Sequence, residues 1–174
     1  GVRADSLLEQ SRRQVLSLLK ADKQYRCIFT SGATESNNMA IKGVTSRYKN
    51  RGKHIITSAI EHPSVLSVCS FLKMQGHEIT MLPVDEYGQI KEDDLKEALR
   101  SDTVLVSLMH VNNEIGSIHD IMALGKIIKE KSNAIFHVDA AQSAGKFPIE
   151  LDDSQIDMLS FSAHKFFGLK GAGA

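Results

Sequence analysis

The stretch TVLVSLMHVNNEIGSIHDIMALGKIIKEKSNAIFHVD, residues 103–139, decides the fold. Apolar runs open it at 103–110 and close it at 134–139, and residues 120–131 between them repeat apolar side chains at helical spacing. Neither run alternates much with polar residues, which is typical of strands that are covered on both faces. A strand, a helix and a second strand in this order predict a parallel pair with a crossover helix.

The same alternation continues on both sides of this stretch. Further strands are predicted at 25–30, 54–58, 77–82 and 156–162, and further helices at 6–20, 31–49, 63–75, 91–100 and, shortest, 140–145. The fold class is therefore α/β, with a mostly parallel sheet and helices on both faces, in a single domain over residues 1–174. The helix at 6–20 carries one apolar stripe of Leu7, Leu8, Val15, Leu18 and Leu19.

Composition limits the class of partner. The 174 residues are 42% hydrophobic, and 21 Lys+Arg balance 21 Asp+Glu. The lack of a basic cluster argues against a nucleic-acid partner, and no apolar run approaches the ~18–20 residues of a membrane span. Cys27 and Cys69 lie within apolar strand-like and helix-like runs, so both are predicted to be buried core residues in a reducing, cytoplasmic setting. The seven histidines show no metal-ligand spacing, so no metal is predicted.

Polar residues follow five of the predicted strands. In chain order they are Ala33 and Thr34 with Ser31 and Gly32, then Glu61 and His62, Asn112 and Asn113, Asp139 and Gln142, and finally Ser162, His164 and Lys165. Because the carboxyl ends of parallel strands meet at one edge of a sheet, these side chains are expected to lie together, where ligands bind in open α/β sheets.

Each of these residues also has an ordinary structural explanation. Glu35 and residues 31–34 can form a helix cap, His62 can be a turn residue, Asn112 and Asn113 can bond local backbone, Asp139 can cap a helix, and Lys165 can be a solvated surface lysine. Together, however, a helix start, a flat ring, a carboxylate and a lysine suit pyridoxal 5′-phosphate. The helix start would hold its phosphate, the aspartate its ring nitrogen and the lysine its aldehyde.

The motifs FTSGATESNNMAIKG, HIITSAIEHPSVL, MHVNNEIG, HVDAAQSAGKFPIEL and DMLSFSAHKFFG resemble, in order, those of the cysteine desulfurases. These are class V aminotransferase-like enzymes of the fold-type I pyridoxal phosphate fold, and the resemblance covers essentially the whole chain. It implies that Lys165 forms the Schiff base, that His62 stacks on the ring and handles protons, and that Asp139 binds the pyridine nitrogen. It places Ala33, Thr34, Ser162 and His164 at the phosphate, and Asn113 and Gln142 near the phenolic oxygen.

The resemblance also implies the reaction. Enzymes of this family remove sulfur from L-cysteine, leave L-alanine and keep the sulfur as a persulfide, which supplies iron–sulfur cluster or thio-cofactor biosynthesis. They act as homodimers with a sulfur-acceptor or scaffold protein. The persulfide cysteine of the family lies downstream of the lysine, and neither Cys27 nor Cys69 matches it. Residues 1–174 are therefore expected to be part of the large cofactor-binding domain and not to release sulfur alone.

Two departures from the family concern the end of the chain. Leu169 stands where proline is expected. The chain is also expected to stop before the antiparallel strand that the family places between segments 25–30 and 156–162, which predicts a gap in the sheet there. An N-terminal segment and a small C-terminal domain of the family are not represented.

Two other functions stay open at this point. One keeps the fold and changes the chemistry, to a selenocysteine lyase or another class V aminotransferase. The other is a non-catalytic module that binds the cofactor or a partner protein without turnover. An absorbance spectrum separates the last of these from the enzymes, because a lysine-bound cofactor makes a protein yellow.

Overall fold

The computed structural model describes residues 1–21, 25–151 and 153–174. Its five-stranded sheet has the order β2-β1-β3-β4-β5, and every neighbouring pair is parallel. The strands are β1 (His54–Ser58), β2 (Glu78–Leu82), β3 (Thr103–Met109), β4 (Ile135–Asp139) and β5 (Met158–Ser160). The helices are α1 (Val2–Leu18), α2 (Ala33–Arg47), α3 (Pro63–Met74), α4 (Glu92–Ala98), α5 (Ile121–Lys131) and the 3-10 turn η1 (Ala163–Phe166). The α/β fold class and its parallel sheet are confirmed.

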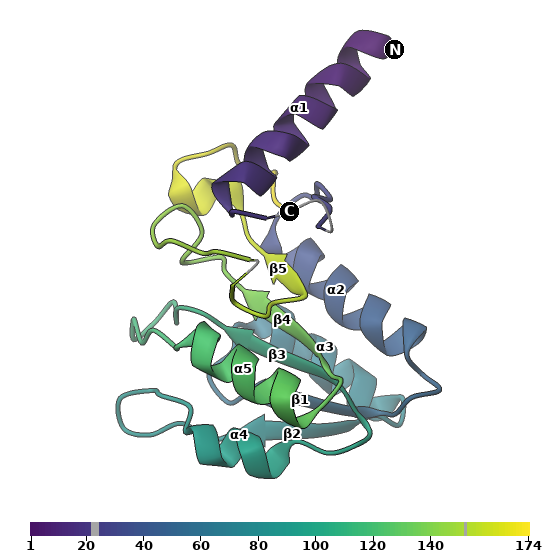
Figure 1. The fold of residues 1–174 in the computed structure, drawn as a ribbon, viewed down its shortest axis with the longest axis vertical. Helices are drawn as coiled ribbons and strands as arrows, with labels where there is room; N and C mark the ends of the chain where they lie inside the picture. The colour runs from purple at the N-terminus through teal and green to yellow at the C-terminus, as the bar shows by residue number, and fades with distance from the viewer. Residues whose placement is uncertain (22–24, 152) are drawn as a thin grey trace.

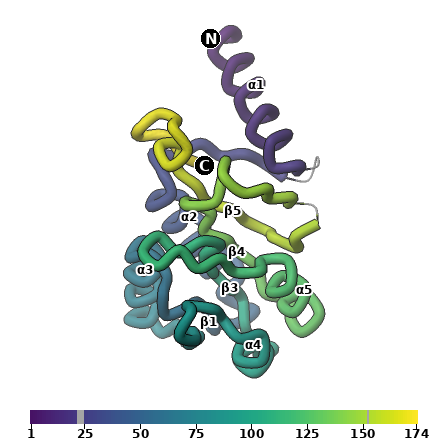
Figure 2. Tube along the Cα trace, turned by 90° about the vertical axis from the view of Figure 1, so that its left-hand side faces the viewer, coloured from purple at the N-terminus to yellow at the C-terminus, as the bar shows by residue number. Residues whose placement is uncertain are grey.

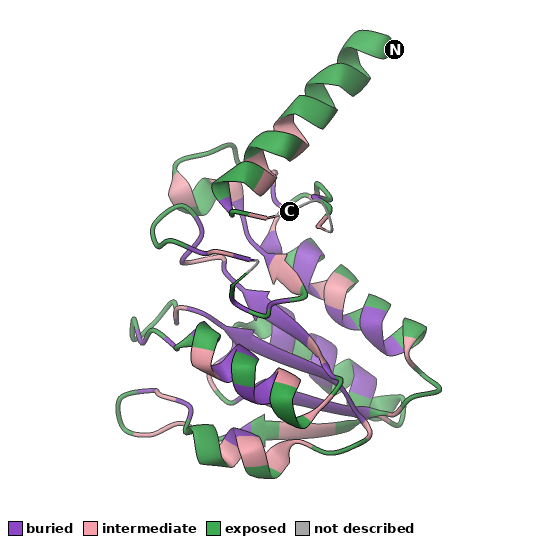
Figure 3. Cartoon of the chain, in the orientation of Figure 1, coloured by how far each residue is buried: buried purple, intermediate pink, exposed green. Residues whose placement is uncertain are grey.

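Helices cover both faces of the sheet. α2 and α3 pack together on one face, and α4 and α5 lie on the other (Figures 1 and 2). Side chains alternate between the two layers. Ile55 of β1 pairs with Leu105 of β3 and joins the α2–α3 cluster, whereas Ile56 pairs with Val106 and joins the α4–α5 cluster. Burial is concentrated on the central strands and on the inner faces of these helices (Figure 3). This double cover explains why the strands read as continuous apolar runs.

Most of the apolar stripe of the first helix is exposed, although Val15 and Leu19 at its end contact the core. α1 forms as predicted, but it contains no buried residue, and Leu7 and Leu18 are 57% and 68% exposed. The helix projects from the body of the molecule (Figure 1). Of the predicted stripe only Leu19, just past the helix end, is buried. The period of the sequence predicted the helix correctly but not what its apolar side contacts, because periodicity carries no information about the partner.

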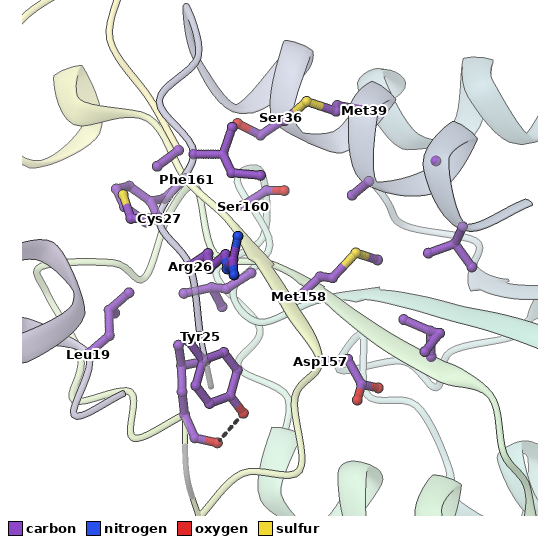
Figure 4. Close-up of a pocket in the computed structure, with 18 of the residues that line it drawn as sticks. Leu19, Tyr25, Arg26, Cys27, Ser36, Met39, Asp157, Met158, Ser160 and Phe161 are labelled. Carbon is purple, nitrogen blue, oxygen red and sulfur yellow. Dashed lines mark hydrogen bonds between the residues drawn. The ribbon is translucent and has the colours of Figure 1, made fainter. Parts of the chain in front are cut away.

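Segment 25–30 is not the strand that the sequence predicted. Only Thr30 makes a bridge, an isolated antiparallel one to Gly173, and Gly173 forms a second antiparallel bridge to Ser162. An apolar groove of about 600 Å³ lies between this segment, α2 and β5 (Figure 4). The predicted gap is therefore present, with Gly173 at its edge. A strand needs partners for its backbone groups, and among the residues that the structure describes no strand lies beside 25–29 to supply them.

Two other predicted elements are shorter or different. The last strand covers Met158–Ser160 and not the whole of 156–162. Residues 141–146 are turns and not a helix. Gly145 ends this run in the left-handed region, with φ 74°, a conformation that stops a helix. Both cysteines are buried, as predicted. No helix in the described part of the chain is long and apolar enough to cross a membrane.

Candidate functional site

The carboxyl ends of the strands surround a cavity of about 260 Å³. Its wall includes every residue that the family resemblance placed at the cofactor: Ala33, Thr34, His62, Asn113, Asp139, Gln142, Ser162, His164 and Lys165. Ser31, Gly32, Glu61 and Asn112, which follow the same strands, are not part of this wall. The parallel register explains the convergence, because Met109 of β3 pairs with Asp139 of β4, and Asp139 pairs with Ser160 of β5. Residues that follow these positions must leave the sheet at the same edge.

One side of the cavity is the start of α2. The Ala33 N–H donates to the Ser162 hydroxyl oxygen at 2.6 Å. The backbone passes close here, since a Cβ on Gly32 would lie 3.2 Å from that oxygen. Glu35 accepts from the Ser31 N–H and hydroxyl, both at 2.7 Å, so the capping explanation is correct for Glu35. This cap joins Ser31 to Glu35, and the positive N-terminal end of the 15-residue helix still faces the cavity at Ala33 and Thr34. A helix end of this kind suits an anion.

Asp139 supplies a buried carboxylate on another side. It is 4% exposed. Its Oδ1 accepts from the Ala141 N–H at 2.9 Å, and its Oδ2 accepts from the Asn37 amide at 2.7 Å. Burial raises the pKa of this carboxyl, while the two hydrogen bonds and the charges of His62 and Lys165 lower it. Asp139 therefore does more than cap a turn, because it also offers a negative charge where water is scarce.

His62 stands at the mouth of the cavity as the N-cap of α3. Its Nδ1 accepts from the Ser64 N–H at 3.1 Å and lies 2.9 Å from the Ser64 hydroxyl. Pro63 occupies the first helical position, where its missing N–H costs nothing. The turn explanation for His62 is thus correct as far as it goes, and the ring lies on the cavity wall as well.

Lys165 lies in η1 behind Ser162, and it is exposed on the cavity wall. Its backbone N–H donates to the Ser162 carbonyl at 3.2 Å. Among the residues that the structure describes, its amine has no hydrogen-bond partner. Exposure agrees with the surface-lysine explanation, and the residue shares the cavity wall with Asp139 and His62.

The two asparagines of the 110–115 loop have different roles. Asn112 is a turn residue, because its Oδ1 accepts from the backbone N–H groups of Glu114 and Ile115 at 2.8 and 3.0 Å. Its amide also donates to the Ile60 carbonyl at 2.8 Å, which ties the loop to the segment before His62. Asn113 is the one that lies on the cavity wall.

The sequence placed Glu61 at this edge of the sheet but did not predict that it is a buried support behind the cavity. Glu61 is fully buried, and its Oε1 accepts from the Ser58 hydroxyl at 2.6 Å and the Met109 N–H at 2.9 Å. It thereby ties the carboxyl end of β1 to that of β3. Burial raises the pKa of this carboxyl to about 8. The only sequence signal was an acidic residue between an apolar strand and His62, which is too ordinary to indicate burial.

Metal ligation is not supported in the described ranges, where no group of three or more His, Cys, Asp or Glu side chains could hold an ion. The sequence matches the family model for aminotransferase class-V over residues 1–174.

The chain belongs to the class-V aminotransferase family.

Within this family the chain is similar to a protein named cysteine desulfurase and to two solved structures with other names. Cysteine desulfurase IscS of Shewanella loihica is 53% identical over 174 residues, which are 100% of this chain and 43% of that protein. Among solved structures, a NifS-like protein superposes with a TM-score of 0.94 at 40% identity and covers 99% of this chain and 47% of its own. A structure described as SspA in complex with cysteine has a TM-score of 0.92 at 41% identity, covering 99% and 50%. The chain thus spans half or less of the length of these relatives, and its fold is that of the NifS-like large domain.

Proposed function

We propose that the whole protein is a pyridoxal 5′-phosphate-dependent cysteine desulfurase and that residues 1–174 supply most of its cofactor site. The observation that carries this is the single cavity in which Lys165, Asp139, His62 and the start of α2 meet. Membership in the class-V aminotransferase family and likeness to proteins named cysteine desulfurase support it.

The donors around the cavity fit this cofactor. The Ala33 N–H, Thr34, Ser162 and His164 offer the hydrogen bonds that a phosphate takes at a helix start. Asp139 would bind the pyridine nitrogen, and the ring of His62 would cover one side of the cofactor. Asn113 and Gln142 would lie near the phenolic oxygen, and the Lys165 amine would hold the aldehyde carbon. When bound, pyridoxal phosphate supplies an electron sink for negative charge at the α-carbon of an amino acid.

The residues of the chain would then move and hold protons. The Asp139 carboxylate keeps a proton on the ring nitrogen because a buried negative charge favours the charged ring. Lys165, which is not paired with an acid in the described ranges, would take the proton from the α-carbon of the substrate. His62 would exchange a proton at Nε2, since its Nδ1 is engaged with Ser64.

The sulfur acceptor is proposed to lie outside residues 1–174. In the reaction a thiolate of the enzyme would form an S–S bond with the sulfur of L-cysteine as the C–S bond breaks. The electron pair of that bond would stay with the β-carbon, which takes a proton to give the methyl group of L-alanine. Burial raises the pKa of the Cys69 thiol to about 12 and also raises that of Cys27. Cys69 packs in the α3 core and Cys27 lines the groove rather than the cavity. Neither thiol is an ionised, mobile nucleophile.

The wider assignments follow the same proposal. We infer that the whole protein acts in the cytoplasm as a homodimer and hands its sulfur to an acceptor or scaffold protein for iron–sulfur cluster or thio-cofactor biosynthesis. Residues 1–174 would be part of the large domain of such an enzyme.

The test measures both products. The whole protein and the 174-residue chain are each incubated with pyridoxal phosphate, L-cysteine and dithiothreitol, and alanine and sulfide are followed. The whole protein should release the two in equal amounts, and the 174-residue chain should release no more sulfide than free cofactor does. Alanine from L-selenocysteine but not from L-cysteine would indicate a lyase, and no alanine from either would refute the proposal.

A further inference from the structure

One buried amide connects two polar groups of the cavity that come from different elements. Asn37 of α2 is 0% exposed. Its Nδ2 donates to Asp139 Oδ2 at 2.7 Å and to the Ser64 hydroxyl oxygen at 2.9 Å. That hydroxyl lies 2.9 Å from His62 Nδ1. A continuous chain of hydrogen bonds therefore runs from the carboxylate at the end of β4 to the imidazole at the start of α3.

The chemistry of the partners sets the direction of each bond. An ionised carboxylate only accepts, so the amide must present its NH₂ group to Asp139, and the same group donates to Ser64. The Ser64 hydroxyl can then give its own hydrogen to His62 Nδ1. The Ser64 backbone N–H also donates to this atom, at 3.1 Å. With two donors aimed at Nδ1, a neutral His62 carries its hydrogen on Nε2.

Packing alone does not account for this amide. Asn37 precedes Ile41 by one helical turn, on the face of α2 that packs against α3 and the sheet with aliphatic side chains. Its Oδ1 is buried without a hydrogen-bond partner among the described residues. A buried carbonyl oxygen without a donor lowers stability, so an aliphatic side chain would serve the interface better. What the amide adds is the link between Asp139 and Ser64.

We propose that Asn37 is a positioning residue of the cavity: its amide fixes the carboxylate of Asp139 and, through the Ser64 hydroxyl, the tautomer and orientation of His62. The catalytic consequence rests on the proposed function, in which these two groups bind one cofactor ring. The hydrogen bonds themselves belong to the chain and are testable without the cofactor.

The expected effect on Asp139 has a definite sign. A donor to the ionised carboxylate favours the charged form, so removing the Asn37 amide should raise the pKa of Asp139. The titratable groups that act on this carboxyl besides are Glu61, His62 and Lys165. All three stay in place in the variants below, so a change can be assigned to the amide.

The experiment uses NMR on the cofactor-free whole protein with ¹³C-labelled aspartate and ¹⁵N-labelled histidine. In Asn37→Leu the pKa of Asp139 should rise by about one unit, a tenfold gain in proton affinity, and the His62 nitrogens should move toward a mixture of tautomers. In Ser64→Ala the hydroxyl is lost from the His62 branch only, so His62 should respond and Asp139 should not.

Thr45→Val is the matched control. Thr45 is buried in the same helix, and its hydroxyl donates only to carbonyls of that helix, Ile41 and Lys42, each at 3.1 Å. This variant loses a buried hydrogen bond without touching the cavity, so neither Asp139 nor His62 should change.

An unchanged pKa of Asp139 in a folded Asn37→Leu protein would overturn the proposal, as would an equal shift in Thr45→Val. If Asn37→Leu does not fold, Asn37→Ala removes the same donor with less bulk and should give the same rise. The result is independent of the sulfide assay. A shifted Asp139 together with no desulfurase activity would refute the proposed function and leave the role of Asn37 standing.

Discussion

Two hollows in the described part of the molecule differ in character, and the larger of the two is not the candidate site. The groove beside β5 measures about 600 Å³ and is lined mostly by apolar side chains such as Leu19, Met39 and Phe161 (Figure 4). The cavity at the carboxyl edge is about 260 Å³ and brings together a lysine, two histidines and a buried carboxylate. A large volume shows only where backbone and side chains lack neighbours. Polar side chains that converge on one cavity indicate a binding or catalytic site. Gly173 lies next to residues of both hollows, because it forms a bridge to Ser162, which lines the cavity, and precedes Ala174, which lines the groove.

The largest expected effect is at the cavity. Lys165→Ala in the whole protein should remove the absorbance of lysine-bound cofactor and lower turnover by several orders of magnitude, because the variant lacks the amine that binds the aldehyde and takes the α-proton. Lys126→Ala, on the exposed face of α5, is the control and should bind and turn over normally. Substantial activity in Lys165→Ala would contradict the assignment of the cavity, and not the groove, as the cofactor site.

A second effect concerns the buried support of the cavity. The pKa of Glu61 is about 8 in the folded chain against an ordinary 4.5, so between these values the folded state holds a proton that the unfolded state releases. The contribution of Glu61 to stability should therefore fall as pH rises from about 4.5 to 8, by up to about 5 kcal/mol at about 1.4 kcal/mol per unit.

Glu61→Gln should flatten this pH profile, measured by urea unfolding across the range. Glu97→Gln, exposed on α4, should leave it as it is. If the difference in stability between the wild type and Glu61→Gln does not change over this pH interval, Glu61 is ionised in the folded state and the prediction is wrong.

A third effect lies at Gly173, next to residues of both hollows. A Cβ on Gly173 would lie 2.5 Å from the Gly32 Cα and 2.7 Å from the Phe161 carbonyl oxygen, so Gly173→Ala forces backbone apart on both sides. It should lower the free energy of unfolding by about 1–3 kcal/mol and weaken cofactor binding, because Gly32 precedes Ala33.

The same substitution at Gly43 should have the opposite sign. A Cβ there meets nothing within 4 Å, and alanine is favoured over glycine in a helix by about 1 kcal/mol. Chemical denaturation of the two variants side by side measures both. If Gly173→Ala is as stable as Gly43→Ala, the close backbone contact at Gly173 is not there.

The smallest effect is predicted for the groove. Met39 lines it and is 45% exposed, so Met39→Ser should change stability by less than about 0.5 kcal/mol and leave cofactor affinity unchanged. Titration with pyridoxal phosphate measures the affinity. A tenfold loss would mean that the groove and the cavity act as one site.

The parts of the fold and site that could be predicted are those that depend on the local pattern of apolar and polar residues along the chain. β1, β3 and β4 are apolar because both faces of the sheet are covered, and their carboxyl ends carry the polar residues of the cavity because parallel strands finish at one edge. The convergence of His62, Asp139 and Lys165 therefore follows from the order of strands and helices along the chain. What these residues bind was suggested by their types and by resemblance.

The parts that could not be predicted depend on non-local partners. In the described part of the chain, segment 25–30 has strand composition but pairs only at Thr30. The stripe of α1 has helical period, but only Val15 and Leu19 contact the core. Asn37 and Glu61 look like any polar residues near a helix start or a turn. Their burial follows only from how α2 and the 59–62 loop dock on the strand ends.

One measurement tests the central claim most directly. The whole protein is loaded with pyridoxal phosphate, reduced with borohydride to make any lysine–cofactor bond permanent, digested and mapped by mass spectrometry. The account predicts a phosphopyridoxyl group on the peptide that contains Lys165 and on no other lysine at comparable yield. Label spread over surface lysines, or concentrated on a lysine away from the cavity, would contradict the assignment of this cavity as the cofactor site.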